Sequence, residues 1–263
     1  MSPLSVIKIG GNIVDDAATL ALFLQLFADV PGKKILVHGG GKVATRIGET
    51  LGIESKYVDG RRITDAATLD LVTMVYAGLI NKKMVAQLQA LGCNAIGLTG
   101  ADANLIPAQK RPVKEIDYGF VGDVKSDRIP GTRWQQLLEM DTIPVVAPLT
   151  HDGNGNMLNT NADTMAQETA KALASYYKVT LIYSFEKSGV LLDASNDNTV
   201  IPKIDPALYA TLRAEQKIFA GMIPKLDNAF AALNSGVDRV IIGNASCLPQ
   251  LLSGEAGTTI IHG

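Results

Sequence analysis

The chain has 263 residues, of which 47% are hydrophobic, and its 24 basic and 26 acidic side chains leave a net charge of −2. This length allows one large α/β domain or two lobes, and the balanced charge gives no reason to expect a nucleic-acid or membrane-surface partner. The apolar runs fall short of the ~20 residues that a membrane-spanning helix needs, and Lys8 interrupts the first run, unlike in a signal peptide.

Cysteine and histidine are sparse. Cys93 and Cys247 lie far apart and form no CxxC pair, which predicts a reducing cytoplasmic location and no disulfide framework. The three histidines are not grouped at metal-ligand spacing, so the sequence predicts no dedicated metal site.

Strand-like apolar runs alternate with helical patterns, which predicts an α/β fold with a mainly parallel sheet and helices on both faces. The predicted strands are 6–9, 34–38, 94–98, 143–147, 179–183 and 239–242. The predicted helices are 17–27, about 42–51, 65–91, about 161–175 and 225–234.

Two segments between these elements have a different character. From about 100 to 141, short alternating runs mixed with glycine and proline predict hairpins and loops, and 151–156 reads as a turn-rich linker. The helix predicted over 65–91 carries apolar residues on more than one face, which fits either a central core helix or a dimer interface.

Two glycine-rich turns, each beside a lysine, follow the first two strands. The first contains Lys8, Gly10 and Gly11, and the second is Gly39-Gly40-Gly41-Lys42. Bare backbone before a helix N-terminus offers N–H donors to anions. Two such turns therefore indicate a polyphosphate or a pair of phosphoryl groups.

Other phosphate-binding patterns fit less well. The Walker A sequence is absent, whereas Gly39, Gly41 and Ala44, with Asp59 further on, fit a dinucleotide-binding GxGxxA pattern. That interpretation leaves Lys8 and its glycine pair without a role, and it falls on the second strand instead of the first.

Five segments together resemble the amino-acid kinase family, essentially from end to end. They are Lys8-Ile9-Gly10-Gly11, Val37-His38-Gly39-Gly40-Gly41, Asp59-Gly60-Arg61-Arg62-Ile63-Thr64, Asn159-Thr160-Asn161-Ala162-Asp163 and Gly221-Met222-Ile223-Pro224-Lys225. Each segment alone is modest evidence, but their order and separations are highly specific.

The resemblance implies a single kinase domain over 1–263 with a three-layer α/β/α sandwich. An N-terminal lobe of about 1–157 would bind an acylated amino acid and dimerise, and a C-terminal lobe of about 158–263 would bind ATP. The implied reaction is ATP-dependent phosphorylation of the γ-carboxylate of N-acetyl-L-glutamate, the second step of arginine biosynthesis. Mg²⁺ would be held mainly by the phosphates.

Three charged residues match the family's catalytic positions. Lys8 and Lys225 correspond to lysines that hold the transferring phosphoryl group, and Asp163 to the carboxylate that orients them. Simpler explanations exist for each residue taken alone: a lysine at a strand end or helix start often extends into solvent, and an acid in a first helical turn is favoured by the helix dipole.

The remaining site residues follow from the same match. Substrate binding is expected at Gly40, Gly41, Arg62, Asn159 and Asn161, with Arg62 on the substrate α-carboxylate. Phosphate binding is expected at Gly10, Gly11 and Gly39. Nucleotide contacts are expected at Ser184, Gly189, Lys217, Ile218, Phe219 and Gly221.

The chain departs from the family pattern at two turns. The turn over 185–189 is one residue longer than the family's usual Asp-Val-x-Gly, and Ala220 replaces the first of two glycines before Lys225. The first change leaves the individual nucleotide contacts open.

The resemblance also implies a homodimer through the helix 65–91, of the short type that lacks an N-terminal extension. Three alternatives remain open: the same reaction on N-succinyl-L-glutamate, another member of the family such as a glutamate 5-kinase, and a catalytically silent sensor that binds an effector with this fold.

Overall fold

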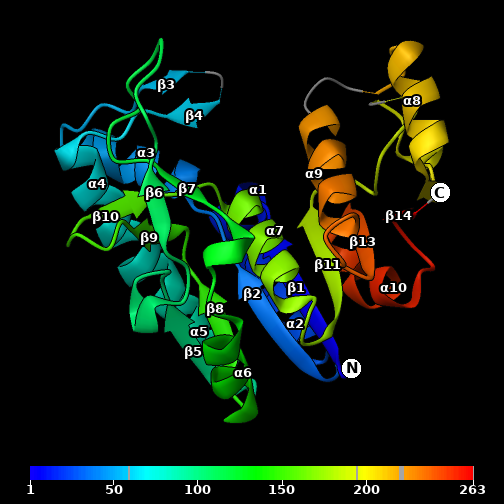
Figure 1. Ribbon diagram of the computed structural model, residues 1–263, viewed down its shortest axis with the longest axis horizontal. Helices are drawn as coiled ribbons and strands as arrows, with labels where there is room; N and C mark the ends of the chain where they lie inside the picture. The colour runs from blue at the N-terminus through cyan, green and yellow to red at the C-terminus, as the bar shows by residue number, and fades with distance from the viewer. Residues whose placement is uncertain (59, 194, 219–221, 263) are drawn as a thin grey trace.

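The central feature of the computed structural model is one eight-stranded sheet (Figure 1). The structure describes residues 1–58, 60–193, 195–218 and 222–262. The strand order is β12-β14-β13-β11-β1-β2-β8-β5, and within the described part of this sheet β13 with β14 is the antiparallel pair. The strands are β1 (Pro3–Ile9), β2 (Lys33–Val37), β5 (Ala95–Leu98), β8 (Ile143–Val146), β11 (Lys178–Phe185), β12 (Lys203–Ile204), β13 (Arg239–Asn244) and β14 (Thr258–Ile260).

Helices cover both faces of this sheet, because side chains alternate along each buried strand. In β1, Leu4 and Val6 pack into one core, and Ile7 and Ile9 pack into the other. The first core is covered by α6 (Gly131–Glu139), α7 (Ala162–Leu173), α8 (Pro206–Ala214) and α9 (Ile223–Leu233). The second is covered by α1 (Gly11–Asp15), α2 (Ala17–Ala28), α3 (Gly41–Thr50), α4 (Ala66–Val72), η1 (Thr73–Ile80), α5 (Asn81–Ala90) and α10 (Leu248–Ser253). The predicted α/β fold with a mainly parallel sheet is therefore confirmed.

Three two-stranded ribbons lie outside the main sheet. The pair β6–β7 confirms a hairpin within 100–141. The prediction of hairpins and loops was wrong for 131–139, which form α6, because Trp134 and Leu138 lie four residues apart and are both buried. The ribbons are β3 (Tyr57–Val58) with β4 (Arg61–Arg62), β6 (Ala108–Lys110) with β7 (Gly122–Val124), and β9 (Leu149–His151) with β10 (Met157–Asn159).

Several short elements were not predicted. The turn-rich segment 151–156 closes the β9–β10 hairpin, in which His151 faces Met157. In the C-terminal part, α8, α10, β12 and β14 were missed. Short 3₁₀ turns complete the described chain at η2 (Asp102–Asn104), η3 (Ser126–Arg128), η4 (Asp197–Thr199) and η6 (Ala245–Cys247).

The helix predicted over 65–91 forms, but its middle is π-helical. Asp65 caps α4 by accepting a hydrogen bond from the Thr68 N–H (2.8 Å), then η1 follows as a wider helix, and α5 continues to Ala90. A π-helical stretch turns more slowly than an α-helix, so the residues after it face a different direction from the one an α-helical count predicts.

Candidate active site

Lys8, Asp163 and Lys225 come from β1, α7 and α9 and meet at one carboxylate. The Lys8 Nζ lies 2.7 Å from the Asp163 Oδ1, and the Lys225 Nζ lies 3.0 Å from the Asp163 Oδ2. Alternation along β1 explains the meeting, because Lys8 projects from the same face as Leu4 and Val6, the face that α7 and α9 cover. Three residues far apart in the sequence therefore form one ionic cluster.

The charge state of this cluster is fixed by the two ammonium groups. Burial alone would raise the pKa of Asp163, but Lys8 and then Lys225 outweigh it and lower that pKa to about 2. The carboxyl group is thus ionised at neutral pH and does not act there as a proton acceptor. Two cations beside one anion leave a net positive charge at the site.

The two glycine-rich turns lie against each other at the carboxyl ends of β1 and β2. The Gly10 N–H donates to the Ser184 carbonyl oxygen (2.9 Å), which ties the first turn to β11. A Cβ built on Gly39 would lie 3.9 Å from the Gly11 Cα. In open α/β sheets, the carboxyl ends of the strands are where ligands bind.

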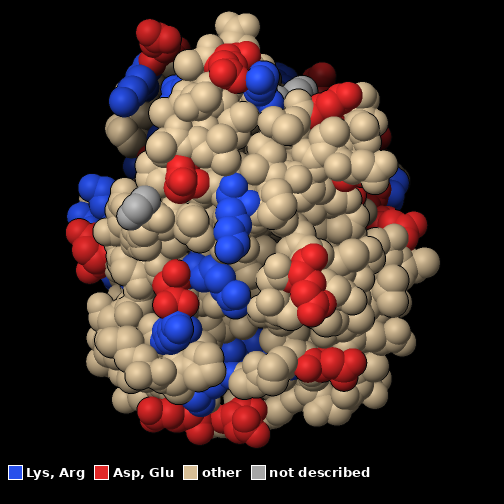
Figure 2. All heavy atoms as spheres, turned by 90° about the vertical axis from the view of Figure 1, so that its right-hand side faces the viewer, with Lys and Arg blue, Asp and Glu red and all other residues tan. Residues whose placement is uncertain are grey.

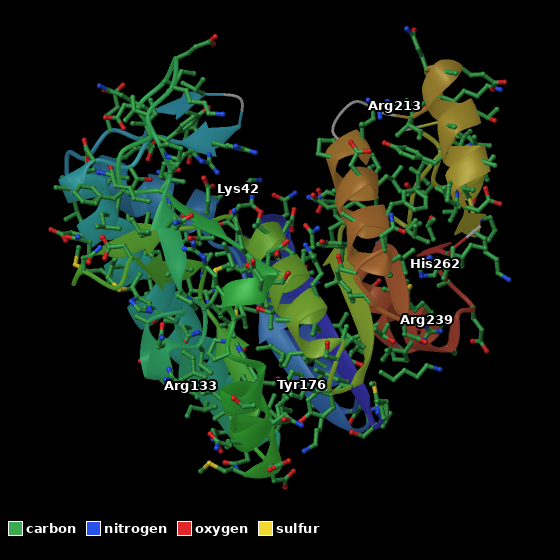
Figure 3. The ribbon with its side chains drawn as sticks, in the orientation of Figure 1. Lys42, Arg133, Tyr176, Arg213, Arg239 and His262 are labelled. Carbon is green, nitrogen blue, oxygen red and sulfur yellow. The ribbon has the colours of Figure 1, made fainter. Side chains whose placement is uncertain are left out.

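A cavity of about 230 Å³ opens beside the second glycine turn. Its wall brings together residues from α3, β4 and the segment between β10 and α7. Predicted substrate residues make up much of the lining: Gly40, Gly41, Arg62, Asn159 and Asn161, together with Gly39. Lys42 is exposed at the beginning of α3, on the side of that helix toward α7 (Figure 3).

Arg62 is held rigidly in the wall of this cavity. Its Nη2 donates to the Gly41 carbonyl oxygen (2.8 Å) and to the Thr45 Oγ1 (3.0 Å), and its Nη1 donates to the Ser55 hydroxyl. The guanidinium also lies over the Tyr57 ring, 4.8 Å from the ring centroid. A buried guanidinium beside a glycine turn, whose backbone no side chain covers, is suited to bind a carboxylate.

The two predicted amides have different surroundings. The Asn159 Nδ2 donates to the Thr64 Oγ1 (3.0 Å). The Asn161 Oδ1 caps α7 by accepting from the Thr164 N–H (3.0 Å), so this oxygen is occupied within the helix cap. The amide nitrogen of Asn161 is the part of that side chain left for a ligand.

Sequence reasoning missed three further residues that line the cavity. Tyr57, Tyr76 and Arg111 come from β3, η1 and the loop after β6. The Arg111 Nη2 lies 2.6 Å from the Asp123 Oδ1. No motif marks these positions in the sequence, because tertiary packing alone brings the three elements to one cavity.

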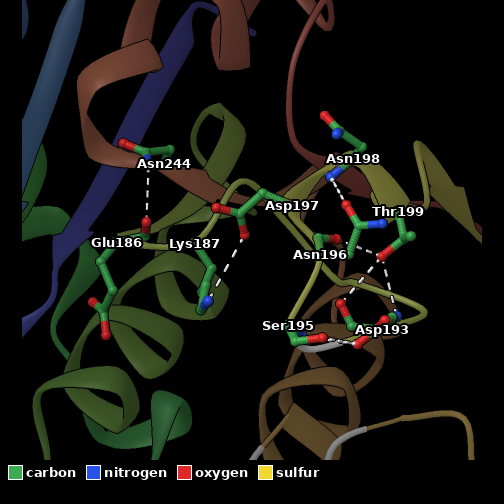
Figure 4. Close-up of polar contacts among 9 residues, drawn as sticks. All are labelled: Glu186, Lys187, Asp193, Ser195, Asn196, Asp197, Asn198, Thr199 and Asn244. Atoms are coloured by element: carbon green, nitrogen blue, oxygen red, sulfur yellow. Dashed lines mark hydrogen bonds and ion pairs between the residues drawn. The ribbon is translucent and has the colours of Figure 1, made fainter.

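The predicted nucleotide residues at the two ends of the segment 184–189 are packed into the structure. The side chain of Ser184 is buried, and a Cβ on Gly189 would lie 2.8 Å from the Thr258 Oγ1. Between them, the Asn244 Nδ2 donates to the Glu186 carbonyl oxygen (2.9 Å), and the Lys187 Nζ lies 3.8 Å from the Asp197 Oδ1 (Figure 4). The Ser184 hydroxyl is buried and has no hydrogen-bond partner among the described residues.

The second nucleotide segment follows α8. The Lys217 Nζ lies 2.8 Å from the Glu215 Oε2, and Ile218 is buried in the core that α7 and α9 share. Phe219 and Gly221, with Ala220, lie outside the described residues. In Figure 3, Arg213 lies near the end of α8 and extends toward α9, where its Nη1 is 3.8 Å from the Asp227 Oδ1.

Among the described residues, no group of three or more His, Cys, Asp or Glu side chains is arranged to hold a metal ion. Within the same part of the chain, no helix has the length and apolarity needed to cross a membrane. The face toward α8 and α9 carries both signs of charge, with acidic side chains on either side of a central column of basic ones (Figure 2).

Paired ammonium groups beside two glycine turns at the end of a parallel sheet define an anion-binding α/β protein. Residues 3–244 match the sequence profile of the Amino acid kinase family, and the chain belongs to this family. The resemblance inferred from the five segments is thereby confirmed.

Similar proteins include one named acetylglutamate kinase from Bacteroides fragilis, which is 59% identical over 93% of this chain and 93% of its own length. A crystal structure of smu.665 from Streptococcus mutans is 30% identical, covers 98% of both chains and superposes with a TM-score of 0.77. Carbamate kinase from Giardia lamblia, solved with AMP-PNP, shares the fold with a TM-score of 0.73 at 14% identity and covers 100% of this chain and 99% of its own.

Proposed function

We propose that this chain transfers the γ-phosphoryl group of ATP to the γ-carboxylate of N-acetyl-L-glutamate, as a step of arginine biosynthesis. The observation that carries the proposal is the convergence of Lys8 and Lys225 on Asp163. The activity named for the 59% identical relative supports the choice of substrate. The fold shared with a carbamate kinase solved with AMP-PNP supports ATP as the phosphoryl donor.

The chemistry needs charge neutralisation more than acid–base catalysis. A substrate carboxylate oxygen attacks the γ-phosphorus, a new O–P bond forms, and the bond to the β–γ bridging oxygen breaks to release ADP. The attacking carboxylate is already ionised at neutral pH, so no protein base is required. In this proposal Lys8 stabilises charge on the attacking side and Lys225 on the leaving side.

Asp163 keeps both ammonium groups at fixed positions before substrates arrive. Without this carboxylate, two cations close together would repel each other and rotate into solvent. The backbone N–H groups of Gly11 and Gly39 supply further donors to the phosphoryl oxygens, whereas the Gly10 N–H is already bonded to the Ser184 carbonyl oxygen. Arg62 and Asn159 hold the acylated amino acid in the cavity of about 230 Å³.

In this proposal, different parts of the chain bind the two substrates. The residues of about 1–157, together with Asn159, bind the acylated amino acid, and those of about 158–263 bind ATP through the segments 184–189 and 217–221. Mg²⁺ would be bound mainly by the ATP phosphates, since the described residues offer no carboxylate cage. The bound ion supplies further neutralisation of phosphate charge.

A coupled ADP-release assay tests this proposal. We expect turnover with N-acetyl-L-glutamate and ATP, and background rates with free glutamate or aspartate. Turnover on free glutamate would instead indicate a glutamate 5-kinase. Binding of an acylated glutamate without ADP release would indicate a sensor.

Whether the substrate carries an acetyl or a succinyl group needs a separate test, because a succinyl group carries an extra carboxylate. Arg61 and Arg111 line the same cavity as Arg62, so cations other than the proposed α-carboxylate ligand are close to a bound substrate. Acetyl and succinyl substrates should be compared by kcat/KM in the wild type and in Arg61→Gln. A selective loss for the succinyl substrate in the variant would support N-succinyl-L-glutamate as the substrate.

The homodimer is also part of the proposal. Met74 and Leu79 are large apolar side chains of η1 that remain exposed in the single chain. Their burial against a second copy would explain this exposure. Light scattering coupled to size-exclusion chromatography should give a dimer that dissociates in Met74→Glu. A hexamer would contradict the dimeric state, and a dimer unaffected by that change would contradict this interface.

A cytoplasmic location belongs to the proposal as well. Cys93 and Cys247 are both free thiols, which fits a reducing compartment.

A further inference from the structure

His38 stands immediately before the second glycine turn and is completely buried. Its Nδ1 lies 2.8 Å from the Gly39 carbonyl oxygen, and its Nε2 lies 3.2 Å from the Asn81 Nδ2. The Asn81 Nδ2 also donates to the Val145 carbonyl oxygen (2.9 Å). A buried polar pair therefore connects α5 and β8 to the backbone of the glycine turn.

The hydrogen-bond partners determine which nitrogen of His38 carries the proton. The Asn81 amide nitrogen has two hydrogens, and the Val145 oxygen accepts one of them. The other points at the His38 Nε2, which must accept it with a lone pair. The proton of the neutral imidazole is therefore on Nδ1, where it is donated to the Gly39 carbonyl oxygen.

This hydrogen bond orients a peptide group in the candidate site. A trans peptide is planar, so its C=O and N–H point in opposite directions. The Gly39 carbonyl is directed at the His38 ring, and the Gly40 N–H is consequently directed away from it. None of the described residues accepts a hydrogen bond from that N–H, although both glycines line the substrate cavity.

We propose that His38 and Asn81 are positioning residues that hold the Gly39–Gly40 peptide with its N–H facing the substrate carboxylate and the phosphoryl group it receives. The proposal rests on the proposed function and adds residues that touch neither substrate. A fixed donor at this point stabilises the charge that develops during transfer, whereas a rotating peptide must be reordered in every turnover.

The packing around Asn81 agrees with a fixed position. Asn81 is buried and is the first residue of α5, directly after the π-helical segment. A Cβ on Gly97 of β5 would lie 2.0 Å from the Asn81 Oδ1, so this glycine leaves space for the amide. Two residues of η1, Tyr76 and Ile80, pack directly against Gly40. The helical segment therefore meets the glycine turn both through these two side chains and, by way of His38, through Asn81.

Two substitutions at His38 separate positioning from general packing. In His38→Asn, the side-chain amide nitrogen takes the place of Nδ1 and can still donate to Gly39, whereas His38→Leu fills the space without a donor. We expect His38→Leu to lower kcat by about 10- to 100-fold with little change in the KM for ATP, and His38→Asn to recover most of kcat. Lys178→Ala replaces a surface lysine and is the control, in which kcat and the KM for ATP should both be unchanged.

Nuclear magnetic resonance of the imidazole nitrogens gives a readout that does not depend on activity. In ¹⁵N-labelled protein at pH 7, His38 should show the neutral form protonated on Nδ1, with signals assigned by their loss in His38→Asn. A proton on Nε2, or a cationic ring, would overturn the hydrogen-bond arrangement. Wild-type kcat in His38→Leu, or equal losses in both variants, would overturn the positioning role.

These readouts also separate this proposal from the proposed function. Absence of turnover by the wild type on every acylated glutamate would contradict the proposed function. The nitrogen signals would still decide whether His38 donates to the glycine turn.

Discussion

Gly40 lies so close to Ile80 that no side chain fits between the second glycine turn and the π-helical segment. A Cβ on Gly40 would lie 2.3 Å from the Ile80 Cδ1 and 3.1 Å from the Tyr76 Cδ1. The backbone of the turn therefore rests directly on the side chains of η1. The helix predicted over 65–91 determines the position of a turn that belongs to a different part of the sequence.

The substitution Gly40→Ala should destabilise the protein through this contact. Overpacking of a buried site costs about 1–3 kcal/mol, because Ile80 and Tyr76 must leave their preferred rotamers. At the adjacent Gly41, a Cβ would meet the Arg62 Nη2 at an ordinary 3.9 Å, so Gly41→Ala is the matched control. Urea unfolding of both variants measures the difference, and equal stability would contradict the packing described.

Replacement of Lys8 should affect turnover more than nucleotide binding. The Lys8 ammonium faces the phosphoryl group in the proposed reaction, so Lys8→Ala should lower kcat by about 10²- to 10³-fold while the KM for ATP changes modestly. Lys178 provides the control, since its Nζ pairs with the surface residue Asp238 at 3.6 Å. Near-normal turnover in Lys8→Ala would remove Lys8 from the active site.

The substitution Arg62→Lys should act selectively on the acylated amino acid. The planar guanidinium contacts the Gly41 carbonyl and Thr45 at once, and a lysine ammonium cannot reproduce that geometry. We expect a rise in the KM for the acylated glutamate of at least about tenfold, with the KM for ATP nearly unchanged. Steady-state kinetics with each substrate varied in turn provide the measurement. Equal effects on both constants would argue against a carboxylate contact.

The free energy of unfolding should decrease on acidification, over the pH range between the pKa of His38 in the unfolded chain and its pKa in the folded protein. Burial lowers the pKa of this imidazole from 6.5 to about 4, an effect that its hydrogen bond to Gly39 only partly offsets. Between these values the unfolded chain binds a proton that the folded chain does not, so the free energy of unfolding falls as the pH falls. This difference in pKa corresponds to about 3 kcal/mol in the free energy of unfolding. That stability is fully present above pH 6.5 and is lost as the pH falls toward 4.

A comparison with His38→Asn isolates this contribution. Urea unfolding at pH 7 and at pH 4.5 should show a smaller loss of stability in His38→Asn than in the wild type. The carboxyl group of Asp163 does not interfere, because its own contribution is lost only between its ordinary pKa of 3.8 and about 2. Parallel curves for the two proteins would show that His38 is not buried as described.

Much of the fold could be predicted because its signals are local. The strands β1, β2 and β11 are each built around a short apolar run, and α7 begins at a capping Asn161 with Asp163 in its first turn. The missed elements are short or hidden in polar segments. The helix α6 spans Gly131–Glu139 with three buried residues, and β12 has two residues, so neither produces a long periodic pattern.

The candidate site was predictable where chemistry and backbone requirements coincide in one short segment. Glycines beside Lys8, glycines at 39–41 and the arginine pair at 61–62 are such segments. Tyr57, Tyr76 and Arg111 were not predictable, because each lies in a segment without a functional motif and reaches the cavity only through packing.

The sequence by itself determined the succession of the longer strands and helices, the two glycine turns and the identities of the charged residues, since these depend on spacing and on the chemistry of neighbouring residues. Only the tertiary structure decided that Lys8 and Lys225 share one carboxylate, and that the buried ring of His38 lies between the Gly39 carbonyl and the Asn81 amide. The physical reason is that direction and proton position are set by contacts between elements far apart in the chain, which no local pattern records.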